Sequence, residues 1–494
     1  MADQMALVAF TTPSGTGTWD ITDSSLTETV KAGLFFNCAE TSDDANGSHA
    51  LLNIGFVADD GVQVDELSAA SCARSTDNLT TTPTCQTVKA TSVGGAADIV
   101  LMTASKGTAS TLGMQHDFSS FITNGIRLNA VTVTNQGKGV ALLFAGVSRA
   151  VVGAFGATTT LTAEAVASPS TFRPDLIILS GDTGAWPAAA TFGNDGRLNL
   201  GFVIDDGSSS QVCYGQDLNN GLEPSDCDAE ARTDRAGIAY TGDAGRATNR
   251  LRITVTSTGF DHQIVTGTDP INCHYLAIQF ASKPPMFVGN FATPTSPTSA
   301  AAFATTGVTP QIVIGSSSLL TATDASESGA TAGGSGRFMF SSTVQRAISV
   351  HSEAGLTATA GTPTNADTRV GTHSVLTLGN TGSVAHQADF VSMDAAGFTL
   401  NFTTAATGLL TCLAIGVGNL TSVQGETVQI SDGFVGLLSQ TLVVGEVVEI
   451  SDGFASATQT AAMDPGVATG ATFQGGAVAG TTTQGGAEDG ETVS

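Results

Sequence analysis

Positively charged side chains are scarce in this sequence. Its 494 residues include 18 Lys and Arg against 44 Asp and Glu, which gives a formal net charge of −26 at pH 7. A protein that binds a phosphate backbone needs clustered cations, so we expect no nucleic-acid partner. Charged residues of both signs make up 13% of the chain, about half of the usual share. Small residues replace them, with 58 Gly among them, and this composition favours short strands and turns over helices.

Long hydrophobic runs are also missing. The apolar stretch 139–147 is among the longest, whereas a helix that crosses a bilayer needs about 20 apolar residues. No basic segment followed by an apolar one marks the start as a secretory signal peptide. We therefore expect a protein that is made in the cytoplasm and does not insert into a membrane.

The sequence motifs of common enzymes are absent. The chain has no HExxH, no GxSxG, no Walker A loop and no GxGxxG before a helix. His116 precedes Asp117 and His386 lies near Asp389, but a surface His beside an Asp is more often a hydrogen-bond partner than an acid–base pair. We predict no catalytic residue, no cofactor and no bound metal.

Aromatic side chains that stack on sugars or bases are few. The chain has 24 Phe but 3 Tyr and 2 Trp, a set that is typical of a hydrophobic core. Trp19 or Trp186 would suit a carbohydrate pocket, but we favour partly buried structural roles for both.

Internal repetition is the strongest positive signal in the sequence. The phrase LNIGFVADDG (52–61) recurs as LNLGFVIDDG (198–207). Early phenylalanines (Phe10, Phe155 and Phe291) and late glycines (Gly125, Gly259 and Gly397) recur in the same order, with a period of about 140 residues. We place the three repeats at 1–148, 149–284 and 285–420, followed by a tail at 421–494.

Each repeat has the pattern of a β-sandwich. Segments such as 198–205, in the repeated phrase, and 398–402 alternate apolar and small or polar residues, as half-buried strands do, and Gly and Asp turns separate them. We predict an all-β chain of three tandem antiparallel, jelly-roll-like sandwiches. Gly55 and Gly201 should let the facing sheet or an aromatic ring approach closely. The side chains expected to face inward are Ile54, Phe56, Leu200 and Phe202.

An acidic pair ends the repeated phrase. Asp59–Asp60 and Asp205–Asp206 occupy this place in the first two repeats, and we align Ser341–Ser342 with them in the third. We interpret the pair as a turn after a core strand, with contact to a divalent cation as the alternative. A shared catalytic site on this pair would be lost from the third repeat. Function is therefore expected to lie in loops that differ between the repeats, namely 43–48, 185–190 and 327–334.

Four of the seven cysteines form matching pairs. Cys72 and Cys85 are 13 residues apart, and Cys213 and Cys227 are 14 residues apart in the equivalent loop. We predict two loop-closing disulfides, with free thiols or half of a metal site as alternatives. The three remaining cysteines, expected to be small core side chains, are Cys38, Cys273 and Cys412.

The tail has a shorter period. Segments 425–436 and 445–456 are nearly the same and start 20 residues apart, and we predict that they form a β-hairpin tail. Two such units are too small to bury an apolar face alone. We therefore expect a homo-oligomer, with a trimer as first guess, in which 421–494 contacts a neighbouring copy.

The order of these motifs resembles a repeated β-module of uncharacterised virion-associated proteins of tailed phages. The resemblance includes the strands 174–181 and 310–317 and the Arg-Thr-Asp loops 73–77 and 231–235, and it covers about residues 5–420. It implies a place on the particle surface or tail, and it brings no catalytic residues.

The function expected from the sequence is therefore that of a non-enzymatic structural or adhesive virion protein. A fibre, a spike or a capsid decoration would fit, with other virion proteins and a host-surface glycan as further partners. A glycan-binding module of a bacterial surface protein is the alternative. A polysaccharide-degrading virion enzyme is less favoured, because the third repeat lacks the acidic pair.

Overall fold

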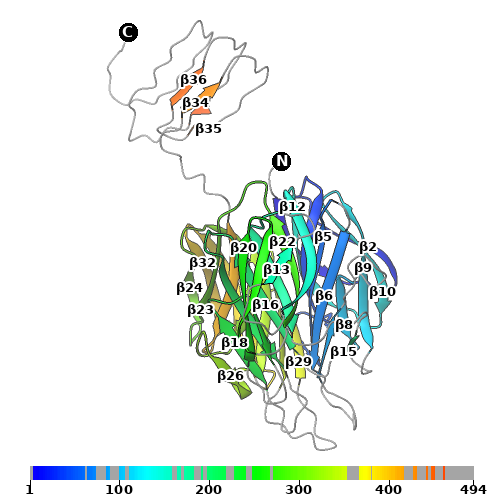
Figure 1. The fold of residues 1–494 in the computed structure, drawn as a ribbon. Helices are drawn as coiled ribbons and strands as arrows, with labels where there is room; N and C mark the ends of the chain where they lie inside the picture. The colour runs from blue at the N-terminus through cyan, green and yellow to red at the C-terminus, as the bar shows by residue number, and fades with distance from the viewer. Residues whose placement is uncertain are drawn as a thin grey trace, which may run out of the picture. The chain divides into compact units, whose positions relative to one another are not determined.

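Strands are the dominant secondary structure of the described chain, so the predicted all-β class is confirmed (Figure 1). Among the described residues, the single helix is the short 3-10 turn η1 (Gly329–Thr331), and none has the length and apolar character to span a membrane. The structure, a computed structural model, describes residues 4–61, 64–73, 85–89, 99–105, 111–157, 164–167, 172–182, 191–192, 197–218, 227–240, 247–267, 271–352, 366–379, 381–416, 427–430, 441–442, 447–450 and 460–461.

The first repeat folds into two antiparallel sheets. Its large sheet has the strand order β1-β11-β3-β5-β6-β7, and its small sheet has the order β2-β10-β9-β8. The strands are β1 (Gln4–Thr11), β2 (Gly17–Thr22), β3 (Val30–Asn37), β4 (Asn46–Ser48), β5 (Ala50–Asp59), β6 (Val64–Ala73), β7 (Cys85–Lys89), β8 (Leu101–Ala104), β9 (Leu112–Ile122), β10 (Gly125–Val133) and β11 (Lys138–Ala145).

The second repeat has the same two strand orders. Its large sheet is β12-β22-β14-β16-β17-β18, and its small sheet is β13-β21-β20-β19. The strands are β12 (Arg149–Ala157), β13 (Glu164–Ala167), β14 (Leu176–Asp182), β15 (Thr191–Phe192), β16 (Arg197–Ile204), β17 (Ser210–Asp217), β18 (Asp228–Arg232), β19 (Gly237–Tyr240), β20 (Ala247–Thr256), β21 (Gly259–Thr266) and β22 (Ile271–Gln279).

The third repeat follows the same plan. Its large sheet is β23-β33-β25-β27-β28-β29, and its small sheet is β24-β32-β31-β30. The strands are β23 (Met286–Ala292), β24 (Thr298–Ala304), β25 (Pro310–Ser318), β26 (Ser326–Ser328), β27 (Gly334–Ser341), β28 (Gln345–Ser352), β29 (Ala366–Gly371), β30 (Val375–Leu378), β31 (Val384–Asp394), β32 (Gly397–Thr404) and β33 (Leu409–Gly416).

The topology shares only part of the jelly-roll plan. The first and last strands of a repeat pair with each other, as β1 does with β11, and the second and second-last pair in the other sheet, as β2 does with β10. The strands between them stay in one sheet each, because β3, β5, β6 and β7 form one meander and β8, β9 and β10 another. A jelly roll instead combines two Greek keys.

Each repeat lends a short strand to its neighbour. β15 of repeat 2 pairs with β7 of repeat 1, β26 of repeat 3 pairs with β18 of repeat 2, and β4 of repeat 1 pairs with β29 of repeat 3. The last of these contacts joins the first repeat to the third. The three repeats therefore close a ring, a name we use for the described residues of 4–416, and they belong to one compact unit, residues 1–418.

The exchanged strands change the interpretation of the variable loops. Loop 43–48 contains β4, and loop 327–334 contains part of β26 and η1. Their backbones extend neighbouring sheets, so these two segments are not plain loops. That they carry the function stays a prediction. Loop 185–190 lies outside the described residues.

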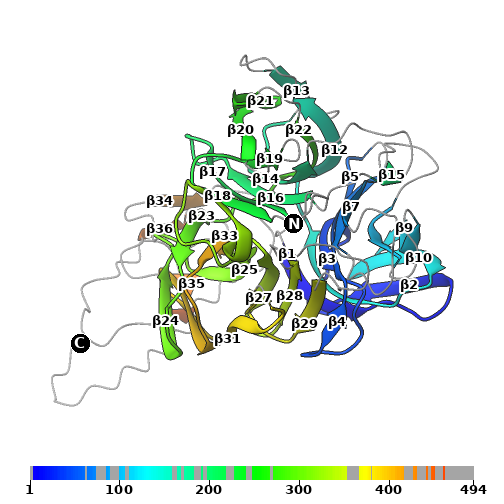
Figure 2. The ribbon, with the colours of Figure 1, turned by 90° about the horizontal axis from the view of Figure 1, so that it is seen from below.

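The ring has two kinds of hydrophobic core. Inside each sandwich, the large and small sheets pack against each other, as Phe35 and Val57 do against Ile126 and Leu128 in repeat 1. A further core forms where the three large sheets face one another around a common centre, with the small sheets outside (Figure 2). Its members from the three repeats include Leu34, Phe56, Ile178, Phe202, Ile314 and Met339.

The central core explains why the large-sheet strands are apolar throughout. β5 is buried from Ala50 to Ala58, and β16 and β33 are buried along their whole length. The expectation that the repeated phrase forms a half-buried strand is therefore wrong, because both faces of the large sheet are covered. Ile54, Phe56, Leu200 and Phe202 are buried as predicted, but in the core shared by the three repeats.

Two glycines of the repeated phrase allow the sheets to approach closely, as predicted. A Cβ atom on Gly55 would lie 1.9 Å from the carbonyl oxygen of Val100, and one on Gly201 would lie 1.8 Å from that of Ala236. Real Cβ atoms do not approach other atoms so closely, so the backbone of the facing segment occupies the space that a side chain would need.

The described part of the tail pairs in parallel. β34 (Thr427–Ile430) pairs with β36 (Val447–Ile450), and β35 (Thr441–Leu442) pairs with β37 (Thr460–Ala461). Thr427 faces Val447, so the register equals the 20-residue repeat. The predicted hairpin tail is therefore wrong: strands of a hairpin run antiparallel, whereas equivalent strands of successive repeats stack side by side in the same direction.

Candidate functional site

The acidic pair of repeat 2 caps a turn and joins two segments. Asp205 accepts hydrogen bonds from Arg173 at 2.6 and 2.8 Å, and this bond lowers the pKa of Asp205. Asp206 accepts hydrogen bonds from the backbone N–H and hydroxyl groups of Ser208 and Ser210. Partial burial raises the pKa of Asp206, but these hydrogen bonds outweigh it and leave the pKa well below its usual range. The interpretation of the pair as a turn is confirmed in repeat 2.

The third repeat differs from our sequence alignment by one residue. Ile178 faces Phe202 in repeat 2, and the equivalent Ile314 faces Met339 in repeat 3. Ser342, rather than Ser341, therefore occupies the place of Asp205 in the sheet. The aligned phenylalanine, Phe338, sits where repeats 1 and 2 have glycine and fills the sandwich core of repeat 3.

One side chain pins the small sheet to the large sheet in every repeat. Gln211 accepts a hydrogen bond from the backbone N–H of Ile253 (3.0 Å) and donates to its carbonyl oxygen (3.1 Å). At the equivalent positions, Glu66 accepts from the N–H of Phe118 and Gln345 accepts from that of Phe390. Sequence reasoning missed this contact, because it joins positions 42 to 52 residues apart with different side chains.

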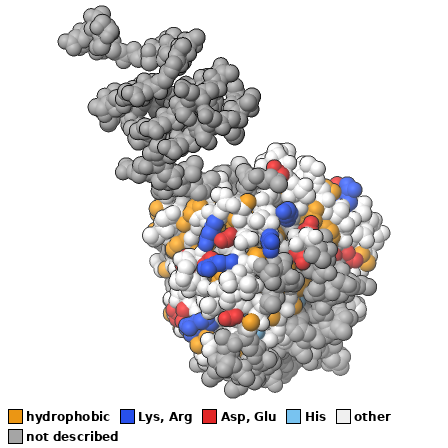
Figure 3. Space-filling model, turned by 45° about the horizontal axis from the view of Figure 1, so that its top comes forward, with side chains coloured by type: hydrophobic (Ala, Val, Ile, Leu, Met, Phe, Trp, Pro, Cys, Tyr) orange, Lys and Arg blue, Asp and Glu red, His pale blue; other side chains and the backbone are white. Residues whose placement is uncertain are grey.

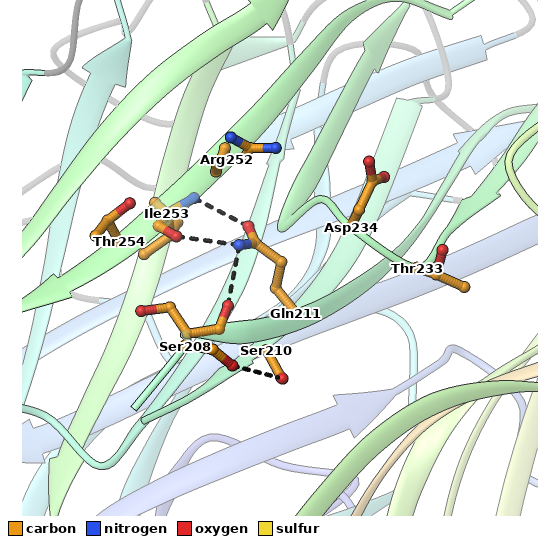
Figure 4. A pocket seen from close by; sticks show the side chains of 9 residues that line it. Ser208, Ser210, Gln211, Thr233, Asp234, Arg252, Ile253 and Thr254 are labelled. Atoms are coloured by element: carbon orange, nitrogen blue, oxygen red, sulfur yellow. Dashed lines mark hydrogen bonds between the residues drawn. The ribbon is translucent and has the colours of Figure 1, made fainter. Parts of the chain in front are cut away.

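A polar pocket lies beside this contact in repeat 2. Its volume is about 330 Å³, at the lower end of the range of about 300–1,000 Å³ for small-molecule sites. Figure 4 shows Gln211 between the loop that carries Thr233 and Asp234 and the strand that carries Arg252 and Thr254. The remaining lining residues are Ser208, Ser209, Ser210 and Ile253. The serines that follow the acidic pair and the Arg-Thr-Asp loop, two regions seen in the sequence, thus meet here.

The charges around the pocket are unevenly paired. Asp234 contacts Arg232 (3.1 Å) and Arg235 (2.5 Å), and its side chain stays 46% exposed. Arg252 is exposed and forms no ion pair within the described chain. Burial lowers the pKa of Arg235, Asp234 raises it, and the nearby charge of Arg252 lowers it further. The pocket therefore has one unpaired cation and one exposed carboxylate on its rim.

Hydrogen bonds beside this pocket hold repeat 3 against repeat 2. Asp324 has a positive φ of 62°, and its backbone N–H donates to the carbonyl oxygen of Ala231 (2.8 Å). Its carboxylate accepts hydrogen bonds from the N–H and hydroxyl of Thr233 at 2.9 and 2.8 Å. The same contact buries the carboxylate of Glu230 completely, with Arg250 at 2.7 Å and Arg232 at 3.4 Å.

The contact between repeats 1 and 3, which closes the ring, has the same backbone hydrogen bond as the contact between repeats 2 and 3, but different charged side chains. Asp44 has a φ of 60° and donates its N–H to the carbonyl oxygen of Val370 (2.8 Å), as Asp324 does to Ala231. His373 of repeat 3 lies between two carboxylates, with Nδ1 2.6 Å from Asp389 and Nε2 2.9 Å from Asp44. His373 therefore joins a carboxylate of its own repeat to one of repeat 1.

The two His–Asp neighbours in the sequence do not form pairs. His116 accepts a hydrogen bond from the indole of Trp19 (3.0 Å), whereas Asp117 accepts one from Gln115 (3.0 Å). His386 contacts the carbonyl oxygen of Ala406 and the hydroxyl of Thr293. Asp389 is instead bound by His373, a residue that sequence reasoning missed because its second partner, Asp44, lies 329 residues away.

Trp19 has the structural role that we favoured. Its ring packs 5.8 Å from that of Phe10 and 5.4 Å from that of His116, measured between centroids. It is partly buried against the sandwich core of repeat 1, so it offers no open platform for a sugar. Trp186 lies outside the described residues.

We expect acid to destabilise the ring through His116. Burial lowers the pKa of His116 from 6.5 to about 4, so the unfolded chain takes up a proton between these values that the folded chain rejects. The contribution of His116 to the free energy of unfolding is therefore at its maximum above pH 6.5, and it falls by about 3 kcal/mol as the pH drops to 4. Urea unfolding at pH 7 and pH 4 checks this, and His116→Asn, which keeps an acceptor for Trp19, should show a smaller loss. The same pH dependence in both proteins would contradict the assignment.

The predicted Cys213–Cys227 disulfide is wrong. Cys213 faces Arg232 in the sheet, and Cys227 lies five residues away from Arg232 along the chain, about 17 Å in extended backbone. A disulfide needs Cα atoms within about 7 Å. The thiol of Cys227 instead donates to the carbonyl oxygens of Leu218 (2.9 Å) and Ser352 (3.3 Å). Cys213 and Cys227 are buried in separate hydrophobic clusters.

The first predicted disulfide lies at the edge of the described chain. The backbone register places Cys85 opposite Ala73 and Cys72 opposite Gln86, but the side chains of both cysteines lie outside the described set, so this bond stays a prediction. The three other cysteines are buried, as expected: Cys38, Cys273 and Cys412.

The described surface is polar and lightly charged. Val131 and Val391 are its exposed large hydrophobic side chains. On the face in Figure 3, scattered charged and hydrophobic side chains lie among backbone and side chains of other kinds. No group of three or more His, Cys, Asp or Glu side chains within the described residues is arranged to hold a metal ion.

Two comparisons with known proteins found no match. No protein-family model matches it, and no curated protein is significantly similar to it.

Proposed function

We propose that this chain is a non-enzymatic structural and adhesive protein on the surface or tail of a tailed-bacteriophage virion. The observation that carries the proposal is the ring itself. Three repeats share one central core and exchange edge strands, so a single chain builds the threefold scaffold that separate subunits often provide. Such a scaffold suits a fibre, spike or capsid decoration that holds a binding surface rigidly. The order of sequence motifs, which resembles virion-associated proteins, points the same way.

The acidic pairs support a role without hydrolysis. In repeat 2, Asp205 is bound by Arg173 and Asp206 by two serines, and in repeat 1 Asp59 accepts the N–H of Gly61 (2.8 Å). A glycosidase needs two carboxylates that are free to face a bond between sugars. Carboxylates that cap turns are held by their own loops.

Self-association is proposed through the tail. The faces that neighbouring sandwiches usually bury against one another are already buried inside the ring. The proposed homo-oligomer, a trimer as first guess, therefore rests on residues 421–494.

Light scattering tests this arrangement. The full chain of 49.6 kDa should give a multiple of that mass, and deletion of 421–494 should give a folded monomer. A deletion variant that keeps its oligomeric mass would contradict the role of the tail. Electron microscopy of intact particles labelled with antibodies against the ring should place it on the capsid surface or tail, and particles without label would overturn the virion role.

Substitution of the acidic pair tests the absence of hydrolysis. Asp59→Asn with Asp60→Asn should leave assembly and attachment to host cells unchanged, with at most a small drop in stability. A measurable glycan-hydrolysing rate that this variant loses would show an enzyme instead.

A glycan-binding module of a bacterial surface protein is the second candidate. The observation that favours it is the polar pocket of repeat 2, because sugars bind to such sites through hydroxyl groups. Localisation on the bacterial envelope, rather than on particles, would favour this candidate.

A further inference from the structure

The pocket of repeat 2 occupies a place that repeat 3 closes with its own charges. Arg252 pairs in the sheet with Gln263, four residues after Gly259, and Asp389 pairs with Asn401, four residues after Gly397. Arg252 and Asp389 are therefore equivalent positions. The equivalent residue of repeat 1 is also acidic. It is Asp117, which pairs with Asn129, four residues after Gly125.

Repeat 2 has Arg252 where the other two repeats have an aspartate, so it has no anion at this position. In repeat 3 the carboxylate of Asp389 lies 2.6 Å from Nδ1 of His373, a residue of the loop that follows β29. In repeat 2 the corresponding loop brings Arg235 and Asp234, and Asp234 is held by Arg232 and Arg235. The guanidinium of Arg252 has no carboxylate of the described chain as a partner. An external anion would complete the site.

The hydroxyl groups around the pocket can accept hydrogen bonds from a ligand, because their own protons are already donated within the protein. Ser208 and Ser210 donate their hydroxyl protons to Asp206, and Thr233 donates its own to Asp324. Their oxygen atoms keep free lone pairs, and so does the exposed carboxylate of Asp234. The rim thus presents one cation and several acceptors. A matching ligand has one anionic group and several hydroxyl donors.

We propose that this pocket binds a uronic acid, a sugar whose carboxylate pairs with Arg252 and whose hydroxyl groups donate to Asp234 and the neighbouring hydroxyl oxygens. The inference rests on the proposed adhesive function and names its ligand class, an acidic sugar of a bacterial surface polysaccharide. The volume of about 330 Å³ fits one sugar ring rather than a chain segment. Gln211 cannot turn toward the ligand, because its amide is committed to Ile253 and Ser209.

Titration of the full-length protein tests the site. Sodium D-glucuronate should bind, as measured by calorimetry or saturation-transfer NMR, and D-glucose and sodium acetate should bind at least about tenfold more weakly, because each offers only half of the matching groups. Arg252→Gln should weaken glucuronate binding by about tenfold or more, since it removes a charge-assisted hydrogen bond. Arg252→Lys should retain part of it.

The matched control is Arg127→Gln. Arg127 is exposed on the small sheet of repeat 1 and pairs with Asp20, so its loss should leave glucuronate binding unchanged. Equal binding of acetate and glucuronate would reduce the site to a general anion site, and unchanged binding in Arg252→Gln would overturn the proposal. Neither result would affect the virion role, which particle labelling tests. Cleavage of glucuronate polymers by the protein would instead overturn the proposed non-enzymatic function, while the proposed uronic-acid site would still hold.

Discussion

Replacing Phe202 with alanine is expected to lower the free energy of unfolding of the whole ring by about 3–5 kcal/mol. Phe202 is completely buried in the central core, where side chains of all three repeats meet. Its removal leaves a cavity that neighbouring large sheets cannot easily fill, because they are held by each other and by the exchanged strands. The lost contacts belong to three repeats, so all three should become less stable together.

Urea unfolding followed by circular dichroism measures this loss, and hydrogen exchange resolves it by repeat. Peptides from β5, β16 and β27 should all exchange faster in Phe202→Ala. Val391→Ala is the matched control, because Val391 is 47% exposed and its truncation should change stability by less than about 0.5 kcal/mol. Faster exchange in β16 alone would show that the repeats unfold independently and that the central core does not couple them.

Substitution of Glu230 with glutamine should cost about 3 kcal/mol and loosen the contact between repeats 2 and 3. The carboxylate is fully buried and accepts hydrogen bonds from Arg250 at 2.7 and 3.0 Å and from Ser326 at 2.5 Å. Ser326 belongs to the strand that repeat 3 lends to repeat 2. Glutamine keeps the volume but removes the carboxylate that pairs with the largely buried Arg250. It also removes one of the three carboxylates around Arg232, which keeps Asp234 and Asp324.

The same unfolding and exchange measurements apply here. Exchange should rise first in β26 and β18, the two strands that meet at this contact. Asp20→Asn provides the control, because the Asp20–Arg127 pair has the same chemistry but is 35% and 45% exposed, and such surface pairs contribute up to about 1 kcal/mol. Equal losses in the two variants would mean that burial of Glu230 adds nothing to the ring.

The candidate pocket was only partly visible in the sequence. The acidic turn and the Arg-Thr-Asp loop stood out because they recur between repeats. The pocket is lined by part of that loop and by the serines that follow the acidic pair. Arg252 did not stand out, since its significance lies in the contrast with Asp389 at the equivalent position of a sheet. Sequence alignment alone does not reveal that register, as the one-residue shift at Ser342 shows.

The sequence by itself determined the all-β class, the recurrence of one unit, and the burial of the repeated phrase. These properties are local: turn residues, a strand period and apolar side chains act within a few neighbours. Gly55 and Gly201 belong with them, because a glycine between large apolar residues signals close approach of another chain segment.

Only the tertiary structure decided how the repeats join. The exchanged strands β4, β15 and β26 are two or three residues long, too short to leave a pattern, and their partners lie in another repeat. The same limit concealed the Asp44–His373 contact. It also led to the wrong pairing of Cys213 with Cys227, since matching spacing does not show which residues face each other in a sheet. Strands buried on both faces look the same whether they pack inside one sandwich or against two neighbours, because hydrophobic burial has no direction.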